Sequence, residues 1–487
     1  MRTEPGYYPR RRVNETAVPP RPTARLLSVV GDHDVDRFRA ALARAGAALG
    51  PRTLWHINST AEGGGVAELL RANLGYLAGD GLRVRWAIFE GDPRFFQITK
   101  RIHNRLHGDL GDGGELGTQE RAHFDEITRR NAEGLAPLVG PGDVVVVHDP
   151  QPAGLIEGLV AAGTHVVWTC HVGVDHPNDV TRSAWDFLLP MVAPASACIF
   201  TRASYVWDGL LPDRVELIPP CIDPLALKNV ELLPEQREAI VAITGLATPR
   251  ADGDPSFERP DGTDGRVVRQ ADLLQVAPVP AGAPIVTQVS RWDRLKDPLG
   301  VLRGFAEEPT LGDAHLILAG PAPSSVADDP EAEAVLTELR EAWGALPFRL
   351  RTRIHLASLP TADVDENAII VNALQRRADV VVQKSLAEGF GLTVTEAMWK
   401  RRPIVAGAVG GVLEQIDDRV QGLLINPRDL TAFGEAVGSL LADPARAASL
   451  GDAAHERVRE RFLPPQYLAA NLEVVAAVAG GGGLSSP

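Results

Sequence analysis

Short apolar runs rich in β-branched residues alternate along the chain with longer stretches of amphipathic, helix-like pattern. A first series of such runs predicts strands at 53–57, 83–89, 144–148, 165–171, 197–201 and 215–218. A second series predicts strands at 285–290, 315–319, 353–357, 379–383, 404–408 and 422–425. Apolar runs separated by helix-length segments are typical of parallel strands buried on both faces. The pattern therefore predicts an α/β protein with two doubly wound, Rossmann-like domains.

The length supports this division, because 487 residues are too many for a single hydrophobic core. Prolines in the segment 219–224 suit a stiff crossing, so we expect an N-terminal domain at 25–222 and a C-terminal domain at 223–470. The basic, proline-rich residues 1–24 and the glycine-rich residues 471–487 are expected to be flexible. Residues 247–269 lack periodicity and are expected to form a surface insertion rather than a third domain.

Composition narrows the class of function. A formal net charge of −14 argues against a nucleic-acid partner or an anionic membrane. No apolar run is long enough to span a bilayer, and no signal peptide begins the chain, so we expect a cytoplasmic protein. The cysteines Cys170, Cys198 and Cys221 lie in strand-like surroundings without zinc-ligand spacing, and we expect free buried thiols.

A glycine-rich turn follows the first predicted strand. Its residues Gly63, Gly64 and Gly65 precede a predicted helix at 66–77, where backbone N–H groups and the helix dipole favour an anion. The turn matches neither a GxGxxG fingerprint nor a P-loop. A tight turn without any ligand explains the same residues equally well.

Two basic residues follow the first strand of the second domain. Arg291 and Lys296 lie where doubly wound sheets bind ligands, at the carboxyl end of a parallel strand. A guanidinium fork and an ammonium point charge suit a diphosphate leaving group. A solvated charged loop is the alternative interpretation.

The sharpest motif contains two glutamates. Glu388 lies in a glycine-lined turn, and Glu396 lies within the helix that follows. The turn supplies N–H donors and a positive helix end for a phosphate, and the carboxylates can accept from sugar hydroxyls. An acid that merely complements the helix dipole would account weakly for Glu388 and not at all for Glu396.

A histidine ends the strand at 165–171. His171 at the carboxyl end of a parallel strand is expected to face a ligand-binding edge. A satisfied core histidine is the alternative.

Together these motifs resemble glycosyltransferase family 4, whose GT-B fold has two Rossmann-like domains facing across a cleft. The resemblance covers about residues 53–462. Narrower stretches are similar to the glycosyl-transferring trehalose synthases, and related retaining trehalose phosphorylases share much of the pattern. These stretches lie at 58–68, 91–104, 148–152, 170–178, 219–224 and 393–399.

The resemblance implies roles for individual residues. Arg291 and Lys296 would hold the donor diphosphate, and Glu396 would bind the ribose. The Gly64-Gly65 turn would close over the phosphates and the acceptor. Glu388 would hold the transferred glucose together with backbone groups of the turn, and His171 would contact that glucose. The turn residues are Gly389, Phe390, Gly391 and Leu392. We add Asp149 and Gln151 as candidate acceptor contacts.

The implied activity is that of a retaining hexosyltransferase that forms trehalose from a nucleoside diphosphate glucose and glucose, in one or both directions. No Asp-x-Asp motif lies near the predicted site, so we expect neither a cofactor nor an essential metal. A trehalose phosphorylase, a family-4 glucosyltransferase with another small acceptor and a non-catalytic sugar-nucleotide sensor stay open. The donor base is open as well, and a homodimer is compatible with the sequence.

Overall fold

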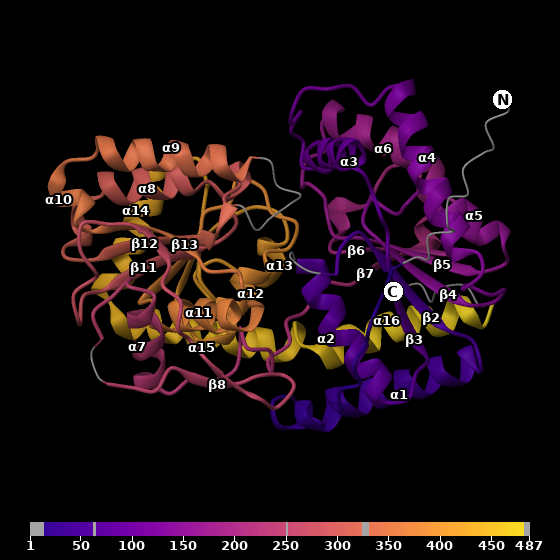
Figure 1. Ribbon diagram of the computed structural model, residues 1–487, viewed down its shortest axis with the longest axis horizontal. Coiled ribbons are helices and arrows are strands. Elements are labelled where there is room, and N and C mark those ends of the chain that lie inside the picture. The colour runs from indigo at the N-terminus through magenta and orange to yellow at the C-terminus, as the bar shows by residue number, and fades with distance from the viewer. Residues whose placement is uncertain (1–13, 62–64, 250–251, 324–330, 482–487) are drawn as a thin grey trace, which may run out of the picture. The chain divides into compact units, whose positions relative to one another are not determined.

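The computed structural model describes residues 14–61, 65–249, 252–323 and 331–481. Two compact α/β units divide this chain (Figure 1). The described residues of unit 1 run to Leu27, continue over Gly31–Ile218 and resume at Leu468, and unit 2 contains Ser28–Val30 and Pro219–Tyr467. The main division thus follows Ile218, whereas the sequence suggested a boundary after residue 222.

Unit 1 is built on a seven-stranded sheet with the order β1-β3-β2-β4-β5-β6-β7. Its strands are β1 (Asn14–Thr16), β2 (Leu54–Asn58), β3 (Val84–Ile88), β4 (Val144–His148), β5 (His165–Cys170), β6 (Ala197–Phe200) and β7 (Val215–Leu217). Its helices are η1 (Thr23–Ser28), α1 (Asp32–Leu49), α2 (Gly65–Gly79), α3 (Pro93–Leu106), α4 (Thr118–Leu135), α5 (Leu155–Ala161), α6 (Asp179–Val192), η2 (Ala203–Tyr205) and η3 (Pro212–Arg214). All neighbouring strands pair in parallel except β1, which is antiparallel to β3.

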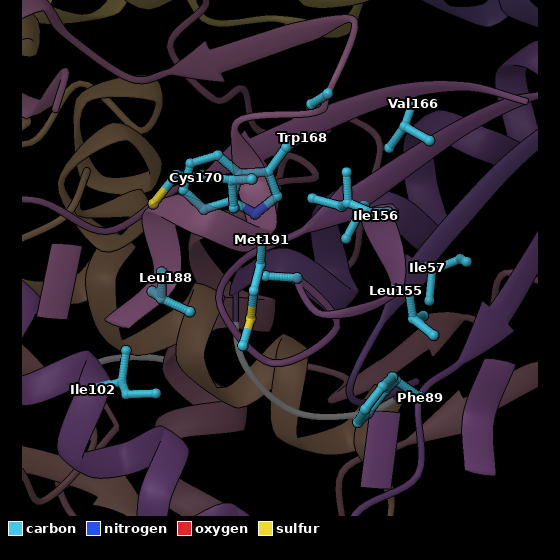
Figure 2. Close-up of a cluster of buried hydrophobic side chains, with 14 of the residues drawn as sticks. Ile57, Phe89, Ile102, Leu155, Ile156, Val166, Trp168, Cys170, Leu188 and Met191 are labelled. Atoms are coloured by element: carbon cyan, nitrogen blue, oxygen red, sulfur yellow. The ribbon is translucent and has the colours of Figure 1, made fainter. Parts of the chain in front are cut away.

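The burial of the central strand β4 shows that this sheet is covered on both faces. Every residue of β4 is buried, and alternate residues of a strand point to opposite faces. Val145 and Val147 join a core to which helices α3 to α6 contribute Phe95, Phe124 and Met191 among others. Figure 2 shows part of this core, with side chains from β5 and α6 together. The apolar run that predicted this strand therefore reflects burial on both sides.

Unit 2 contains a second seven-stranded sheet, in the order β10-β13-β12-β11-β14-β15-β16. Its strands are β10 (Asp272–Leu274), β11 (Ile285–Val289), β12 (His315–Pro321), β13 (Ile354–Leu359), β14 (Val380–Gln383), β15 (Ile404–Gly407) and β16 (Leu423–Ile425). Its helices are α7 (Pro234–Ile243), η4 (Arg294–Lys296), α8 (Pro298–Glu307), η5 (Pro309–Leu311), α9 (Ala332–Ala345), α10 (Phe348–Arg351), α11 (Val364–Arg377), α12 (Leu392–Trp399), α13 (Val412–Gln415), α14 (Leu430–Ala442) and α15 (Pro444–Arg461). Within this seven-stranded sheet, β10 pairs antiparallel with β13, and the other described strand pairs are parallel.

Two separate cores flank this second sheet. In β12, Leu316 and Leu318 belong to the core that includes residues of α8, α9, α14 and α15. Their neighbours Ile317 and Ala319 belong to the other core, which includes residues of α7 and α11. Successive residues of one strand thus serve both faces of the sheet, which is the two-layer covering that the sequence predicts for a doubly wound fold.

The segment 247–269, expected to be a surface insertion rather than a third domain, contains regular structure. Strands β8 (Ser256–Glu258) and β9 (Asp264–Arg266) pair antiparallel, and Phe257 is buried in the core shared with α7 and α11. Arg259 donates to Asp363, the N-cap of α11, with Nη2 2.6 Å from Oδ2. The described part of this segment is therefore a small hairpin attached to unit 2.

The two predicted flexible ends also contain structure. Residues 14–16 form the edge strand β1, so flexibility over the whole of 1–24 is wrong, although 1–13 lie outside the described residues. Helix α16 covers Pro464–Ala479, so the prediction of a flexible tail from residue 471 is wrong as far as Ala479. Leu472 and Val475 of this helix are buried, so its apolar residues pack against the rest of the protein.

A buried histidine pair in unit 2 predicts a pH-dependent stability. His355 Nδ1 lies 2.9 Å from Gln275 Oε1, its Nε2 lies 2.9 Å from His315 Nδ1, and burial lowers the pKa of His355 to about 3. Because the folded pKa lies below the unfolded value, the stabilisation is complete above about pH 6.5 and is lost as pH falls towards 3. We expect the melting temperature to decrease when the pH is lowered from 7 to 5. His355 should contribute to this by reducing the free energy of unfolding by up to about 1.4 kcal/mol per pH unit.

The substitution His355→Gln should make this pH dependence shallower. A matched control is His33→Gln, because the His33 side chain is 91% exposed. Melting curves at several pH values check the pair. An equal slope in the His355 variant and the wild type would contradict the assignment.

Candidate active site

The loops after β11 and β14 carry the main candidate site of unit 2. These strands are paired neighbours, so their carboxyl ends meet at one edge of the sheet. The loops are joined by a backbone hydrogen bond of 2.7 Å from Leu386 N to Leu295 O. Parallel pairing thus brings together two segments that lie almost a hundred residues apart in the chain.

Lys296 and Glu388 meet directly at this edge. Lys296 Nζ forms an ion pair with Glu388 Oε2, and Ser385 Oγ donates to the same oxygen at 3.1 Å. The Glu388 side chain is only 9% exposed, so its charge needs this cation. The sequence assigned the two residues to different parts of a donor, whereas the structure also pairs them with each other.

Arg291 lies earlier in the same loop and is more open. Its side chain is 39% exposed, and its Nη2 is 3.4 Å from Asp293 Oδ2. Asp293 is buried and also accepts from Leu295 N at 2.7 Å, which fixes the start of η4. Arg291 therefore projects from a loop whose backbone is held by its own acidic neighbour.

A second ion pair, absent from the sequence predictions, lies beside the first. Lys384 directly follows β14, its side chain is 1% exposed, and its Nζ pairs with Asp297 Oδ2. Asp297 also caps α8 by accepting from Gly300 N at 3.0 Å. Lys296 thus pairs with Glu388, and the next residue, Asp297, pairs with Lys384. The two ion pairs hold the loop after β11 against the loop after β14. The sequence could have indicated this pair, because Lys384 directly follows an apolar strand and a buried lysine there needs an acidic partner.

The glycine turn before α12 has an unusual backbone. Gly391 has φ 88°, a conformation that side chains rarely adopt. A Cβ on Gly411 would lie 2.5 Å from Gly389 O, so two backbones approach closely here. None of the residues that the structure describes accepts from the N–H groups of Phe390, Gly391 and Leu392. These donors, together with the helix dipole, make the turn suitable for an anion.

Glu396 lies in α12 and is 4% exposed. One turn later, Lys400 Nζ donates to Gln375 Oε1 at 2.8 Å, to Asn229 Oδ1 at 3.0 Å and to Glu396 O at 3.1 Å. Burial lowers the pKa of Lys400 to about 7, while the Glu396 carboxylate opposes this shift. Glu396 therefore has an electrostatic partner inside the protein, which the sequence did not suggest.

His171 in unit 1 ends a stack of three histidines. Its ring is parallel to that of His148 with centroids 5.8 Å apart, and His148 Nε2 lies 2.9 Å from His56 Nδ1. Burial lowers the pKa of all three, to about 3 for His56, so the stack is uncharged at neutral pH. His56 was missed because it lies inside an apolar strand, where the periodicity alone marks it as core.

Asp149 is the neighbour of this stack. It has φ 63°, its N–H donates to Thr169 O at 2.8 Å, and its Oδ1 accepts from His171 N at 2.9 Å. Burial raises its pKa. The structure therefore joins Asp149 to His171, while Gln151 lies two residues further along the same loop and is half-buried.

The glycine turn of unit 1 is described only in part. Gly65 is the first residue of α2, and Gly64 lies outside the described residues. Within the described ranges no group of three or more His, Cys, Asp or Glu side chains is arranged to hold a metal. The same ranges contain no helix with the length and apolarity to span a membrane. All three cysteines are buried and free, as predicted.

Two Rossmann-like units, one with a cation beside a glycine turn, match the GT-B glycosyltransferases, and similarity to known proteins assigns the chain to this class. The family described as Glycosyl transferases group 1 matches residues 363–457, and the family Trehalose synthase, N-terminal domain, matches residues 56–207. A UDP-forming α,α-trehalose-phosphate synthase from Burkholderia vietnamiensis shares the fold, with a TM-score of 0.64 and 16% identity over 88% of this chain and 98% of that one.

Sequence relatives are more specific. The chain is 38% identical to a trehalose synthase of Rubrobacter xylanophilus over 441 residues, covering 90% of this chain and 92% of the relative. A trehalose phosphorylase of Pleurotus sajor-caju is 26% identical over 438 residues and is covered over only 54% of its length. The chain belongs to the trehalose synthase family of glycosyltransferases. The resemblance seen in the sequence motifs is therefore confirmed.

Proposed function

We propose that this protein transfers glucose from a nucleoside diphosphate glucose to free glucose and forms trehalose, with retention of the α configuration. Membership of the trehalose synthase family supports this reaction. The observation that carries the proposal is the site of unit 2, where Lys296 pairs with Glu388 directly before a turn of N–H groups that have no acceptor among the described residues. Such a site offers both a cation and a sugar-binding carboxylate.

The donor binds through its diphosphate and its glucose in this proposal. An ammonium carries three hydrogens, so Lys296 can hold Glu388 with one and a phosphate oxygen with another. Arg291 adds a planar fork for the diphosphate. Glu388 accepts from glucose hydroxyls, and Glu396 accepts from the ribose. Backbone groups of residues 389–392 and the turn at Gly64 and Gly65 complete the donor contacts.

The acceptor side involves unit 1. His171, uncharged at neutral pH because burial lowers its pKa, contacts the transferred glucose without adding a positive charge beside it. Asp149 holds the His171 backbone and, with Gln151, accepts from hydroxyls of the incoming glucose. Asp149 therefore serves both as a support for His171 and as an acceptor contact.

The reaction proceeds on one face of the transferred sugar. The bond from the anomeric carbon to the phosphate oxygen breaks, the acceptor hydroxyl oxygen bonds to that carbon, and its proton moves to the departing phosphate oxygen. Arg291, Lys296 and the N–H groups before α12 stabilise the negative charge that develops on the leaving group. Water has to be excluded, since it would otherwise hydrolyse the donor.

Chelation is expected to leave the activity intact. The positive charge at the leaving group is supplied by Arg291, Lys296 and the helix end, so we propose that no metal or cofactor is needed. Trehalose formation should be the same before and after treatment with EDTA. Complete loss that magnesium or manganese restores would contradict this expectation.

Two other functions would use the same candidate residues. A trehalose phosphorylase would cleave trehalose with inorganic phosphate, and a sugar-nucleotide sensor would bind without turnover. The lower coverage of the fungal phosphorylase disfavours the first. The complete set of Arg291, Lys296, Glu388 and Glu396 disfavours the second. A family-4 transferase with another small acceptor differs only on the acceptor side.

Product analysis tests the proposal. The purified protein is incubated with glucose and with ADP-, UDP- or GDP-glucose, with and without phosphate. Trehalose should form with at least one donor, independently of phosphate, and the released nucleotide should match the donor base. Phosphate-dependent cleavage of trehalose, a different glucoside from an acceptor screen, or binding without any product would each replace this proposal with one of the alternatives.

A further inference from the structure

Gln415 ends helix α13 and is completely buried, yet it points at the glycine turn before α12. Its Nε2 donates to Phe390 O and lies 3.4 Å from Gly391 O, while its Oε1 accepts from Thr395 Oγ1 at 2.7 Å. This orientation of the amide satisfies its hydrogen bonds, whereas a flipped amide would place Oε1 against the carbonyl oxygens. The side chain thus holds the Phe390 carbonyl directly and lies near the Gly391 carbonyl, which also accepts from Val394 N at 2.9 Å.

That direction decides where the donors of the turn point. In a trans peptide the C=O and the following N–H point in opposite directions. Since the Phe390 and Gly391 carbonyls turn towards Gln415, the N–H groups of Gly391 and Leu392 turn away from it. These are two of the N–H groups that find no acceptor within the described part of the chain. One buried amide is therefore linked to the anion-binding geometry of the turn.

We propose that Gln415 is a positioning residue for the donor: it holds the two carbonyls inward so that the N–H groups of Gly391 and Leu392 face the diphosphate. This inference rests on the proposed function, because it assumes that a diphosphate binds at the turn. Gln415 itself touches no substrate in this arrangement. Thr395 supports it from the far side by fixing the Oε1 end of the amide.

The substitution Gln415→Glu tests this role most directly. It preserves the shape and the acceptor for Thr395 but replaces the Nε2 donor with an oxygen that repels the carbonyls. We expect about a 10-fold or greater loss of affinity for a nucleoside diphosphate, a rise in KM for the donor, and an unchanged KM for glucose. The probe is whichever of ADP, UDP and GDP the wild type binds most tightly.

A matched control separates this effect from general damage to the core. Gln421 is also buried in unit 2, and its Oε1 accepts from Asp417 N at 2.8 Å, away from the glycine turn. Gln421→Glu makes the same chemical change and should leave nucleotide affinity as in the wild type. A purely structural role for Gln415 would lower the folded fraction and kcat while leaving the affinity of the folded protein unchanged.

Two further variants keep the test decisive. If Gln415→Glu does not fold, Gln415→Met fills the same volume without charge and should show the same affinity loss. Thr395→Val removes one anchor of the amide and should give a smaller loss of a few-fold. Wild-type affinity in a folded Gln415 variant overturns the inference while leaving the proposed function intact. A wild type that binds none of the three nucleotides overturns the inference, because no diphosphate then binds at the turn, and trehalose assays decide separately whether the proposed function holds.

Discussion

Lys296→Ala is expected to lower kcat/KM for the sugar-nucleotide donor by about 30- to 1,000-fold, which corresponds to about 2–4 kcal/mol of transition-state stabilisation. Two effects add in this variant. The diphosphate loses a cation, and the buried Glu388 carboxylate loses its ion-pair partner at the same site. Steady-state kinetics with the preferred donor measure the change.

The same loop provides controls for this prediction. Arg294 is two residues away, 55% exposed and paired with Glu338, so Arg294→Ala should retain almost all activity. Arg291→Ala should be strongly impaired, because it removes the other cation of the proposed diphosphate site. Wild-type turnover in both the Lys296 and Arg291 variants would show that the donor site is assigned to the wrong residues.

The parallel strands of the two sheets could be predicted because most of them are buried on both faces, which leaves a strong apolar signal. The short antiparallel strands β1 and β9 gave no such signal. Strand β1 reads Asn-Glu-Thr and β9 reads Asp-Gly-Arg, so neither shows the apolar pattern of a core strand. Their pairing depends on the neighbouring segment rather than on their own composition. Helix α16 was cut short in the prediction because the glycine run that follows it suggested disorder.

The residues of the candidate site likewise fall into those that the local sequence reveals and those that depend on the fold. Turn and helix-start residues such as Gly391 and Glu388 are visible in the sequence, since their chemistry is local. The pairing of Lys384 with Asp297 and the contact of Gln415 with the glycine turn depend on which strands are neighbours. A single sequence does not state that order. Buried polar residues next to a recognised motif are therefore where a structure adds most.

Substitution of the two glutamates of the motif is expected to affect different properties, turnover for Glu388 and nucleotide affinity for Glu396. Glu388→Gln replaces one strong acceptor with a donor at the reacting sugar, and we expect turnover to fall about 10²-fold or more. Its affinity for a free nucleoside diphosphate, which carries no glucose, should change little. Glu396→Gln should instead weaken binding of the nucleotide itself through the ribose.

Titration of both variants with a nucleoside diphosphate alone tests this division. One complication is specific to Glu396, because its carboxylate supports the charged form of Lys400, whose pKa burial lowers to about 7. Neutralising Glu396 should lower the pKa of Lys400 further, so the titration is done at pH 6 and at pH 8. Direct ribose binding predicts a loss of affinity at both pH values, whereas an effect transmitted only through Lys400 would change with pH, because the charge of Lys400 itself changes between pH 6 and pH 8. An equal loss of nucleotide affinity in the Glu388 and Glu396 variants would refute the separate roles, because Glu388 would then bind the nucleotide rather than the sugar.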